Sequence, residues 1–447
     1  YMAKLPLEGI RILELGQLLA IPHAMKLLCD MGAEVIKIES CVRLNFHRLS
    51  TFLDNDLGPN FWNRAANYND QNRNKYEITL DLTKPQGQLV ARKLALISDI
   101  VAENFTPRVM SSFGLGYESL KELKPDIIML SSTGYGHVGP WYYYAAAGST
   151  TEAASGLLSI TGYPDRIPIL PNIPYNDYVG ALHGAFAVMA ALNYRRLTGK
   201  GQWIDLSQSQ TGSAQIGEVL LDFIVNGRIQ NQIGNRHPYL APHGCYPCKG
   251  DDKWVVIAVS SDQEWQALFA AMGEPLWCQD PMFAETLSRW QNQDELDMHI
   301  SQWTSQYDHY EVMNILQQAG VPSGAVLNNK ELLLDPHYKA RDFYQMNDHP
   351  EETGIGRRPY PGVTWKLSKT PGSIRKPAPT LGQDNEYILG HLLGLSKNEI
   401  SELEREGIIG TVPLGVNQPR VIPLETQKEL GIITDYDPDY KDILGIE

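Results

Sequence analysis

Asp177 is the residue whose type and setting best suit covalent chemistry. It follows the extended, proline-containing stretch 171–176 and precedes a segment, 178–196, in which apolar and small residues recur at helical spacing. On the residues alone, a carboxylate at this place predicts a helix N-cap, worth about 0.5 to 2 kcal/mol. The same amides and the helix dipole would also keep the carboxylate ionised, as a nucleophile toward a thioester must be.

A second group of side chains could bind a metal ion or carry redox chemistry. His237, His243, Cys245 and Cys248 lie close together in a Gly- and Pro-rich stretch. Their spacing matches no structural zinc pattern, and the Cys-x-x-Cys pair precedes a strand, whereas a thioredoxin-like pair opens a helix. We therefore predict neither a metal site nor a redox function here.

Three common catalytic signatures are missing from the sequence. The loop after the first predicted strand has one glycine, Gly16, so the G-x-G-x-x-G dinucleotide fingerprint is absent. Neither a P-loop nor a G-x-S-x-G nucleophile elbow occurs. These absences disfavour an NAD-dependent enzyme, a P-loop NTPase and a serine hydrolase.

The elements around these residues alternate between strands and helices. A helix is expected over 22–31, between the first two strands, and a longer one follows Asp177. This order predicts an α/β fold with a parallel, doubly wound sheet, in which ligands bind beyond the carboxyl ends of the strands. The expected strands are 11–15, 34–38, 77–82, 99–102, 126–131 and 203–206.

A second region follows the Gly- and Pro-rich stretch 234–250. It contains an expected strand at 254–259 and helices near 262–272 and 310–318, which indicates an α+β domain. The proline-rich stretch 359–379 is typical of an extended connector leading to a last helical piece.

Composition limits the partners and the compartment. The chain has 447 residues, enough for about two domains, and a net charge of -14, which disfavours nucleic acid and membrane surfaces. It has five cysteines without framework spacing, and its first residues lack a basic and then apolar leader, so we expect a cytoplasmic protein.

Several segments, occurring in the same order, resemble the family III CoA-transferases and CoA racemases, the CaiB/BaiF family. The resemblance spans nearly the whole chain, and together the segments are highly specific. They are Gly32–Glu39, Leu80–Leu82, Glu103–Pro107, Gly114–Tyr117, Gly134–Gly136, Thr198–Gln202, Ala319–Gly324, Asp335–His337 and Pro377–Pro379.

The resemblance implies a Rossmann-like large domain built from both chain ends, a small middle domain, and two chains interlocked as a dimer. The large domain would comprise 1–225 and 336–447, with a return linker and a tail in its second part, and the small domain with its linker would comprise 226–335. It also implies that coenzyme A or an acyl-CoA is a substrate, without a permanently bound cofactor.

The same resemblance makes Asp177 the catalytic aspartate, since it falls where the family places that residue. This favours the nucleophile over the plain N-cap. Gln17 could in addition hydrogen-bond an oxyanion. The positions implied to cradle CoA and the acyl group are Gln17, Leu19, Ala20, Leu80, Asp81, Thr83, Asn104, Phe105, Thr106 and Gly148.

Departures from the family pattern reduce the number of reactions and substrates that we expect. Racemases of the group have a histidine where this chain has Ala147, so transfer is favoured over two-base racemisation. Formyl-CoA transferases carry a tyrosine and an acidic residue at the positions of Ala147 and Gly148, an arginine at Ser40, and a glycine-rich loop at 235–239. Oxalate and formyl-CoA are therefore disfavoured as substrates.

The segment 142–148, with three tyrosines and then small residues, suits a bulkier acceptor, aromatic or dicarboxylic. Overall the chain is similar to the benzylsuccinate CoA-transferases of the family, which use succinyl-CoA and assemble from two homologous chains. A homodimer and a heteromer both stay open. Two other functions also stay open: an acyl-CoA racemase or isomerase, and a CoA-binding subunit without catalysis.

Overall fold

The computed structural model describes residues 4–446, and its contacts divide the chain into two compact units. The larger unit contains residues 1–157, 171–217 and 336–447, and the smaller unit contains 158–170 and 218–335. This division differs from the expected domains in two places: the smaller unit begins at 218, before the expected 226, and it includes the separate stretch 158–170.

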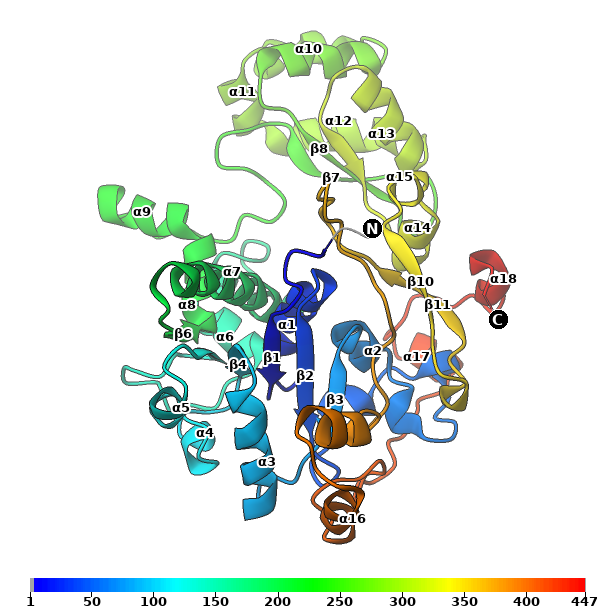
Figure 1. Ribbon diagram of the computed structural model, residues 1–447. Coiled ribbons are helices and arrows are strands. Elements are labelled where there is room, and N and C mark those ends of the chain that lie inside the picture. The colour runs from blue at the N-terminus through cyan, green and yellow to red at the C-terminus, as the bar shows by residue number, and fades with distance from the viewer. Residues whose placement is uncertain (1–3, 447) are drawn as a thin grey trace. The chain divides into compact units, whose positions relative to one another are not determined.

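A six-stranded sheet in the order β3-β2-β1-β4-β5-β6 forms the centre of the larger unit, and every neighbouring pair is parallel. This confirms the α/β fold (Figure 1). Strand order reverses between β1 and β4, and ligands of such sheets bind outside the carboxyl ends of the strands at this point. The strands are β1 (Arg11–Glu14), β2 (Glu34–Glu39), β3 (Tyr76–Thr79), β4 (Ile100–Glu103), β5 (Ile128–Thr133) and β6 (Trp203–Ser207).

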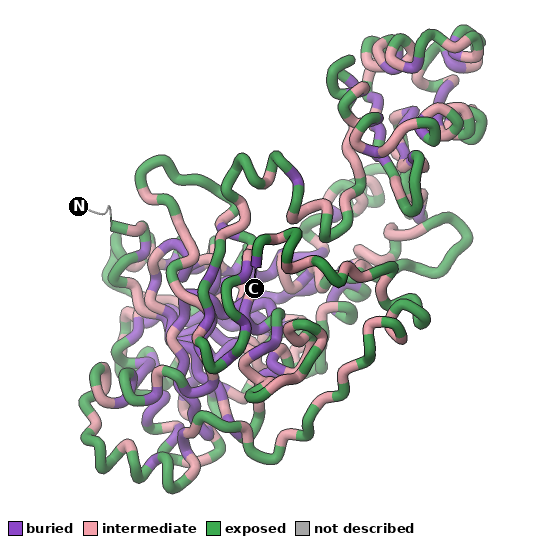
Figure 2. Tube along the Cα trace, turned by 90° about the vertical axis from the view of Figure 1, so that its right-hand side faces the viewer, coloured by how far each residue is buried: buried purple, intermediate pink, exposed green. Residues whose placement is uncertain are grey.

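Helices cover both faces of this sheet, so its short apolar strands are buried on both sides, except for the partly exposed start of β6. Ile12 packs with α1 (Ala20–Asp30) and α7 (Tyr175–Thr198) on one face. Leu13 points to the other face, against α3 (Pro85–Leu96), α5 (Tyr117–Leu123), η8 (Tyr387–Leu392) and α16 (Lys397–Arg405). Figure 2 shows the buried segments concentrated in this layered region.

Short elements complete the larger unit. The tail is held to an early loop, because Lys441 Nζ donates to Asp54 Oδ2 at 2.9 Å. The further elements are η1 (Phe46–Leu49), η2 (Leu53–Asn55), η3 (Phe61–Asn63), α2 (Ala66–Asn72), α4 (Val109–Ser112), α6 (Gly148–Ala154), α8 (Gln208–Gln215), α15 (Pro336–Ala340), β10 (Tyr344–Asp348), η7 (Glu351–Thr353), β11 (Arg357–Pro361), α17 (Leu424–Glu429) and α18 (Tyr440–Leu444).

The smaller unit has its own antiparallel sheet and its own core. Strands β7 (His243–Pro247), β8 (Trp254–Ala258) and β9 (Ser323–Ala325) pair in that order. Val255, Trp265 and Leu316 are fully buried in the core between this sheet and the helices. Those helices are α10 (Asp262–Ala271), α11 (Thr286–Gln291), α12 (Gln293–Thr304), α13 (His309–Gln318) and α14 (Asn329–Leu334), with the turns η5 (Leu276–Gln279) and η6 (Pro281–Phe283).

Two elements cross the boundaries between the units. They are η4 (Leu157–Ser159) and α9 (Gly217–Asn226), and α9 has no buried residue. Over residues 4–446, no helix combines the length and the apolar character that crossing a bilayer requires.

Candidate active site

Asp177 lies in the first turn of α7 and is not its N-cap. The helix begins at Tyr175, and its cap is Pro174, which has no side chain able to accept a hydrogen bond from the first amides. The N-cap interpretation is therefore wrong. Asp177 Oδ1 instead accepts a hydrogen bond from Gln208 Nε2 at 3.0 Å, across to the start of α8.

Burial dominates the electrostatics of this carboxyl group. Loss of solvent raises the pKa of Asp177, the hydrogen bond from Gln208 lowers it, and repulsion from Glu152 adds a smaller increase, so that the pKa is about 6. The sequence predicted that the helix terminus keeps the group readily ionised, and burial outweighs that effect. At neutral pH the carboxylate is still mostly ionised, and its raised pKa makes it a stronger nucleophile.

Gly148, the first residue of α6, leaves room for this carboxylate. A methyl group added at Gly148 would lie 2.8 Å from Asp177 Oδ2 and 2.8 Å from Pro174 Cβ. Neither approach is possible without movement of the backbone of Pro174 or of the carboxylate. The absence of a side chain at this position therefore allows Asp177 to occupy its present position.

Hydrogen bonds join the loop after β1 to the loop after β4. Asn104 Oδ1 accepts from the Gln17 amide at 2.7 Å, and Asn104 Nδ2 donates to the Gln17 carbonyl at 2.8 Å. Lys37 Nζ also donates to the Gly16 carbonyl at 2.7 Å. Leu18, exposed between these anchors, has a φ of 58°, a conformation that costs a bulky residue free energy. The loop is held in one strained shape.

Two further turns lie at the same edge of the sheet. After β3, Asp81 Oδ1 accepts from the Thr83 amide at 3.0 Å and from its hydroxyl at 2.6 Å, which closes a local turn. After β4, the buried Glu103 Oε2 accepts from the Phe105 amide at 2.8 Å, next to the exposed Thr106.

The predicted CoA-binding residues thus differ in which of their groups a ligand could reach. The side chains of Leu19, Ala20 and Leu80 are buried in the core, so only their backbones could touch a ligand. The amide of Asn104 is already bonded to Gln17. CoA binding by the predicted residues stays a prediction.

Sequence reasoning missed Gln208 and Glu152. Gln208 directly follows β6, and a polar residue beyond a strand's carboxyl end was the available signal. Glu152 is the one charged residue in the run 145–156, but only the structure shows that it is buried.

Aromatic side chains gather on the segment before α6. Tyr143 and Tyr144 are exposed, with ring centroids 5.0 Å apart, and Trp141 stacks on Tyr144 at 6.5 Å. The Arg108 guanidinium donates to the Tyr142 hydroxyl at 2.7 Å, so the segment is tied to the turn that follows β4.

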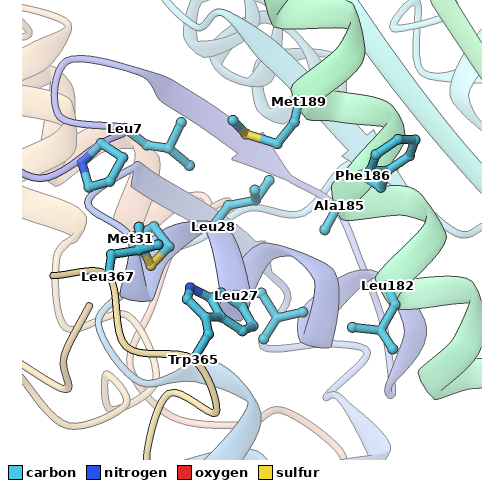
Figure 3. Close-up of a pocket in the computed structure, with 11 residues that line it drawn as sticks. Leu7, Leu27, Leu28, Met31, Leu182, Ala185, Phe186, Met189, Trp365 and Leu367 are labelled. Atoms are coloured by element: carbon cyan, nitrogen blue, oxygen red, sulfur yellow. The ribbon is translucent and has the colours of Figure 1, made fainter. Parts of the chain in front are cut away.

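An apolar pocket of about 310 Å³ lies elsewhere in the larger unit (Figure 3). Leu182, Phe186 and Met189 of α7 line it together with residues of α1, the N-terminal stretch and the segment 365–367. Because none of its lining side chains is an acid, a base or a nucleophile, it cannot perform group transfer. Asp177 is the centre of the candidate site.

Comparisons with known proteins show which family the whole chain resembles. The sequence profile of CoA-transferase family III matches residues 7–385. A succinyl-CoA–D-citramalate CoA-transferase from Chloroflexus aurantiacus is 35% identical over 405 residues, covering 90% of this chain and 98% of that protein. The alpha subunit of a succinyl-CoA–L-malate CoA-transferase from Chloroflexus aurantiacus is 32% identical over 408 residues, covering 91% of this chain and 93% of that subunit.

A solved structure shows the same fold. The crystal structure of a CaiB/BaiF family protein from Brucella suis has a TM-score of 0.78 and 29% identity, covering 87% of this chain and 100% of that one. Profile, relatives and fold lead to one assignment: the chain belongs to CoA-transferase family III, a family of transferase enzymes.

Proposed function

We propose that the protein moves CoA from succinyl-CoA to a carboxylic acid, with Asp177 as the group that carries the CoA. The observation that carries this proposal is the half-buried Asp177 carboxylate in the first turn of α7, with Gln208 as its hydrogen-bond donor and a pKa raised to about 6. The names of the two Chloroflexus relatives, both succinyl-CoA transferases, support the donor.

The first half of the reaction loads the enzyme. The Asp177 carboxylate attacks the carbonyl carbon of the donor thioester, the C–S bond breaks, and CoA leaves as a thiolate with the electron pair. The product is a mixed anhydride between Asp177 and the donor acid. The thiolate then attacks the Asp177 carbonyl carbon, the donor leaves as its carboxylate, and an aspartyl-CoA thioester forms.

The second half returns the carboxylate. The acceptor carboxylate attacks the aspartyl thioester, releasing the CoA thiolate and forming a second anhydride. The thiolate attacks the acceptor's carbonyl carbon, which gives the product acyl-CoA and free Asp177. No net proton is consumed. In each attack on the Asp177 carbonyl, Gln208 Nε2 is placed to donate to the oxyanion that develops there.

The loops at the carboxyl edge of the sheet supply the proposed CoA site. The loop 16–20 is preformed by its bonds to Asn104 and Lys37, so binding need not order it. The exposed Thr83 and Thr106 offer hydroxyl groups at two neighbouring turns.

We propose a dicarboxylic or aromatic acid as the acceptor. The relatives named above act on citramalate and malate, both dicarboxylic acids, and the exposed side chains of Trp141, Tyr143 and Tyr144 could line a site for an aromatic ring. Because one relative is an alpha subunit, a partner chain similar to this one is a possible form of assembly, beside the interlocked homodimer.

Covalent trapping tests the proposal. The protein is incubated with succinyl-CoA, quenched with hydroxylamine, and digested for peptide mass spectrometry. We expect an aspartyl hydroxamate at Asp177 in the wild type and none in Asp177→Asn. If neither succinyl-CoA nor a panel of other acyl-CoA donors labels Asp177 in protein shown to bind CoA, the catalytic role is refuted for this chain, and a CoA-binding subunit becomes the better description.

A further inference from the structure

Glu152 is a buried carboxylate that the proposed reaction does not use. Its residue is 1% exposed, and its Oε1 has no hydrogen-bond partner in the described part of the chain. No lysine, arginine or histidine among residues 4–446 forms an ion pair with it. A buried acid is normally paired, so this one needs an explanation.

Its position in α6 puts it on the face of the helix that lies against Asp177. Glu152 and Gly148 are four residues apart and therefore share one face of the helix. Gly148 lies directly against the Asp177 carboxylate, and α6 packs on both α7 and α8. Glu152 is also the charged group whose repulsion acts on Asp177, beside the effect of burial.

We propose that Glu152 is a positioning residue whose negative charge destabilises the free Asp177 carboxylate and so favours the covalent intermediates. The inference rests on the proposed function, since it assigns a second carboxylate to the same reaction.

The chemistry explains why repulsion promotes the forward step. While Asp177 is free, its charge and that of the buried Glu152 repel each other, and partial burial weakens the screening by solvent. When Asp177 attacks the thioester, the C–S bond breaks and the negative charge departs with the CoA thiolate. Asp177 becomes a neutral acyl group, so its repulsion with Glu152 is relieved in the anhydride and in the aspartyl thioester alike.

A structural role would predict a different arrangement. A carboxylate that stabilises the fold accepts hydrogen bonds or pairs with a cation, as Glu14 does with Lys37 and Lys75. The buried Glu152 has an unsatisfied oxygen and a like charge as its neighbour, which costs stability. That pattern is expected of a group retained for its effect on a reacting residue.

The first experiment compares Glu152→Gln with the wild type. Glu122→Gln, which removes an exposed charge from α5, is the matched control. The rate of hydroxamate formation at Asp177 is measured from pH 5 to 8 with the acyl-CoA that labels the wild type. The midpoint is the pH at which this rate reaches half of its maximum. We expect it to fall by at least about half a pH unit in Glu152→Gln and to stay unchanged in Glu122→Gln. In Glu152→Asp, which keeps the charge, the midpoint should lie close to the wild-type value.

A second readout does not depend on any substrate. Apparent Tm is measured at pH 8 for the wild type, Glu152→Gln, Asp177→Asn and the double variant. We expect Glu152→Gln to raise Tm, and to raise it less when Asp177 is already neutral. If Glu152→Gln does not fold, Glu152→Met, close in volume, takes its place with the same expectations.

The outcomes separate the two proposals. The role of Glu152 is overturned if Asp177 is labelled but the midpoint is unchanged in Glu152→Gln. It is also overturned if Glu152→Gln shifts Tm equally in the wild type and in Asp177→Asn. Either result leaves the transferase proposal intact. Coupled Tm shifts without any labelling in the wild type establish the repulsion and refute Asp177 as the group that carries CoA.

Discussion

At the scale of single residues, two opposing effects act on Asp177. The first turn of a helix favours a negative charge by about 0.3 to 1 kcal/mol. Burial and, to a smaller extent, repulsion from Glu152 disfavour the same charge, and the pKa of about 6 shows that they prevail. The protein therefore holds the proposed nucleophile in an unfavourable state, which should appear in its stability as well as in its activity.

Asp177→Asn should make the protein more stable at pH 8 while abolishing labelling. The folded pKa of about 6 lies above the ordinary value of 3.8, so ionisation costs the folded state free energy as the pH rises from about 4 to 6. Above pH 6 the penalty is complete, up to about 3 kcal/mol, and Asn removes it while still accepting from Gln208. Denaturant unfolding at pH 5 and pH 8 measures this; an equal effect at both values would contradict it.

Gly148→Ala should damage activity without unfolding the protein. The added methyl group would lie 2.8 Å from Asp177 Oδ2, so the carboxylate must shift, and small displacements of reacting groups cost about 10- to 100-fold in rate. Gly217→Ala is the matched control, since nothing lies within 4 Å of the position of its added carbon. Labelling rates and circular dichroism are compared; full activity of Gly148→Ala would show that the carboxylate is not fixed by this contact.

Residue identities at the site were partly predictable from the sequence. Asp177 was singled out through its place in the family pattern, whereas its cap position was misjudged because the helix starts two residues earlier, at Tyr175. Gln208 and Glu152 reach Asp177 only through the packing of α6, α7 and α8, which no local pattern encodes.

At the scale of elements, the sheet was the most predictable part. Runs of β-branched residues bounded by helices give each strand to within a few residues, because burial on both faces demands such runs. The strand expected over 77–82 ends at Thr79, however, since the Asp81 side chain bonds to Thr83 and closes a turn. Side-chain-to-backbone bonds of this kind compete with the ladder.

The Asn104 side chain holds the loops that follow β1 and β4 together. Asn104→Ala should remove both hydrogen bonds to the Gln17 backbone and free the strained Leu18 to relax. We expect a loss of about 1 to 2 kcal/mol in stability and a several-fold weaker binding of CoA, measured by calorimetry. Ser112→Ala, an exposed and purely local contact in α4, is the control. Unaltered CoA affinity in Asn104→Ala would mean that the loop does not need this clamp for binding.

At the scale of the whole larger unit, the two chain ends are joined around buried charges. Arg48, fully buried, contacts Glu39 and Glu77 and donates to the Pro379 carbonyl from 331 residues away in sequence. Its guanidinium also lies 3.4 Å from the ring centroid of Tyr68. The sequence showed a connector returning at 359–379, but contacts of such separation leave no periodic trace, so the charged cluster itself was not foreseen.

Arg48→Met should be the most destabilising of these changes. It leaves two carboxylates buried without a cation, which typically costs about 3 to 5 kcal/mol. Burial already raises the pKa of Glu77 well above its ordinary value, and loss of the guanidinium would raise it further, so protonation can relieve the charge at low pH. The destabilisation should accordingly be larger at pH 8 than at pH 5, as measured by denaturant unfolding. Arg43→Met, at an exposed position, should change stability little at either pH. Adding Glu77→Gln to Arg48→Met should recover part of the loss; a pH-independent loss without recovery would mean that packing on Tyr68, and not charge, is what Arg48 contributes.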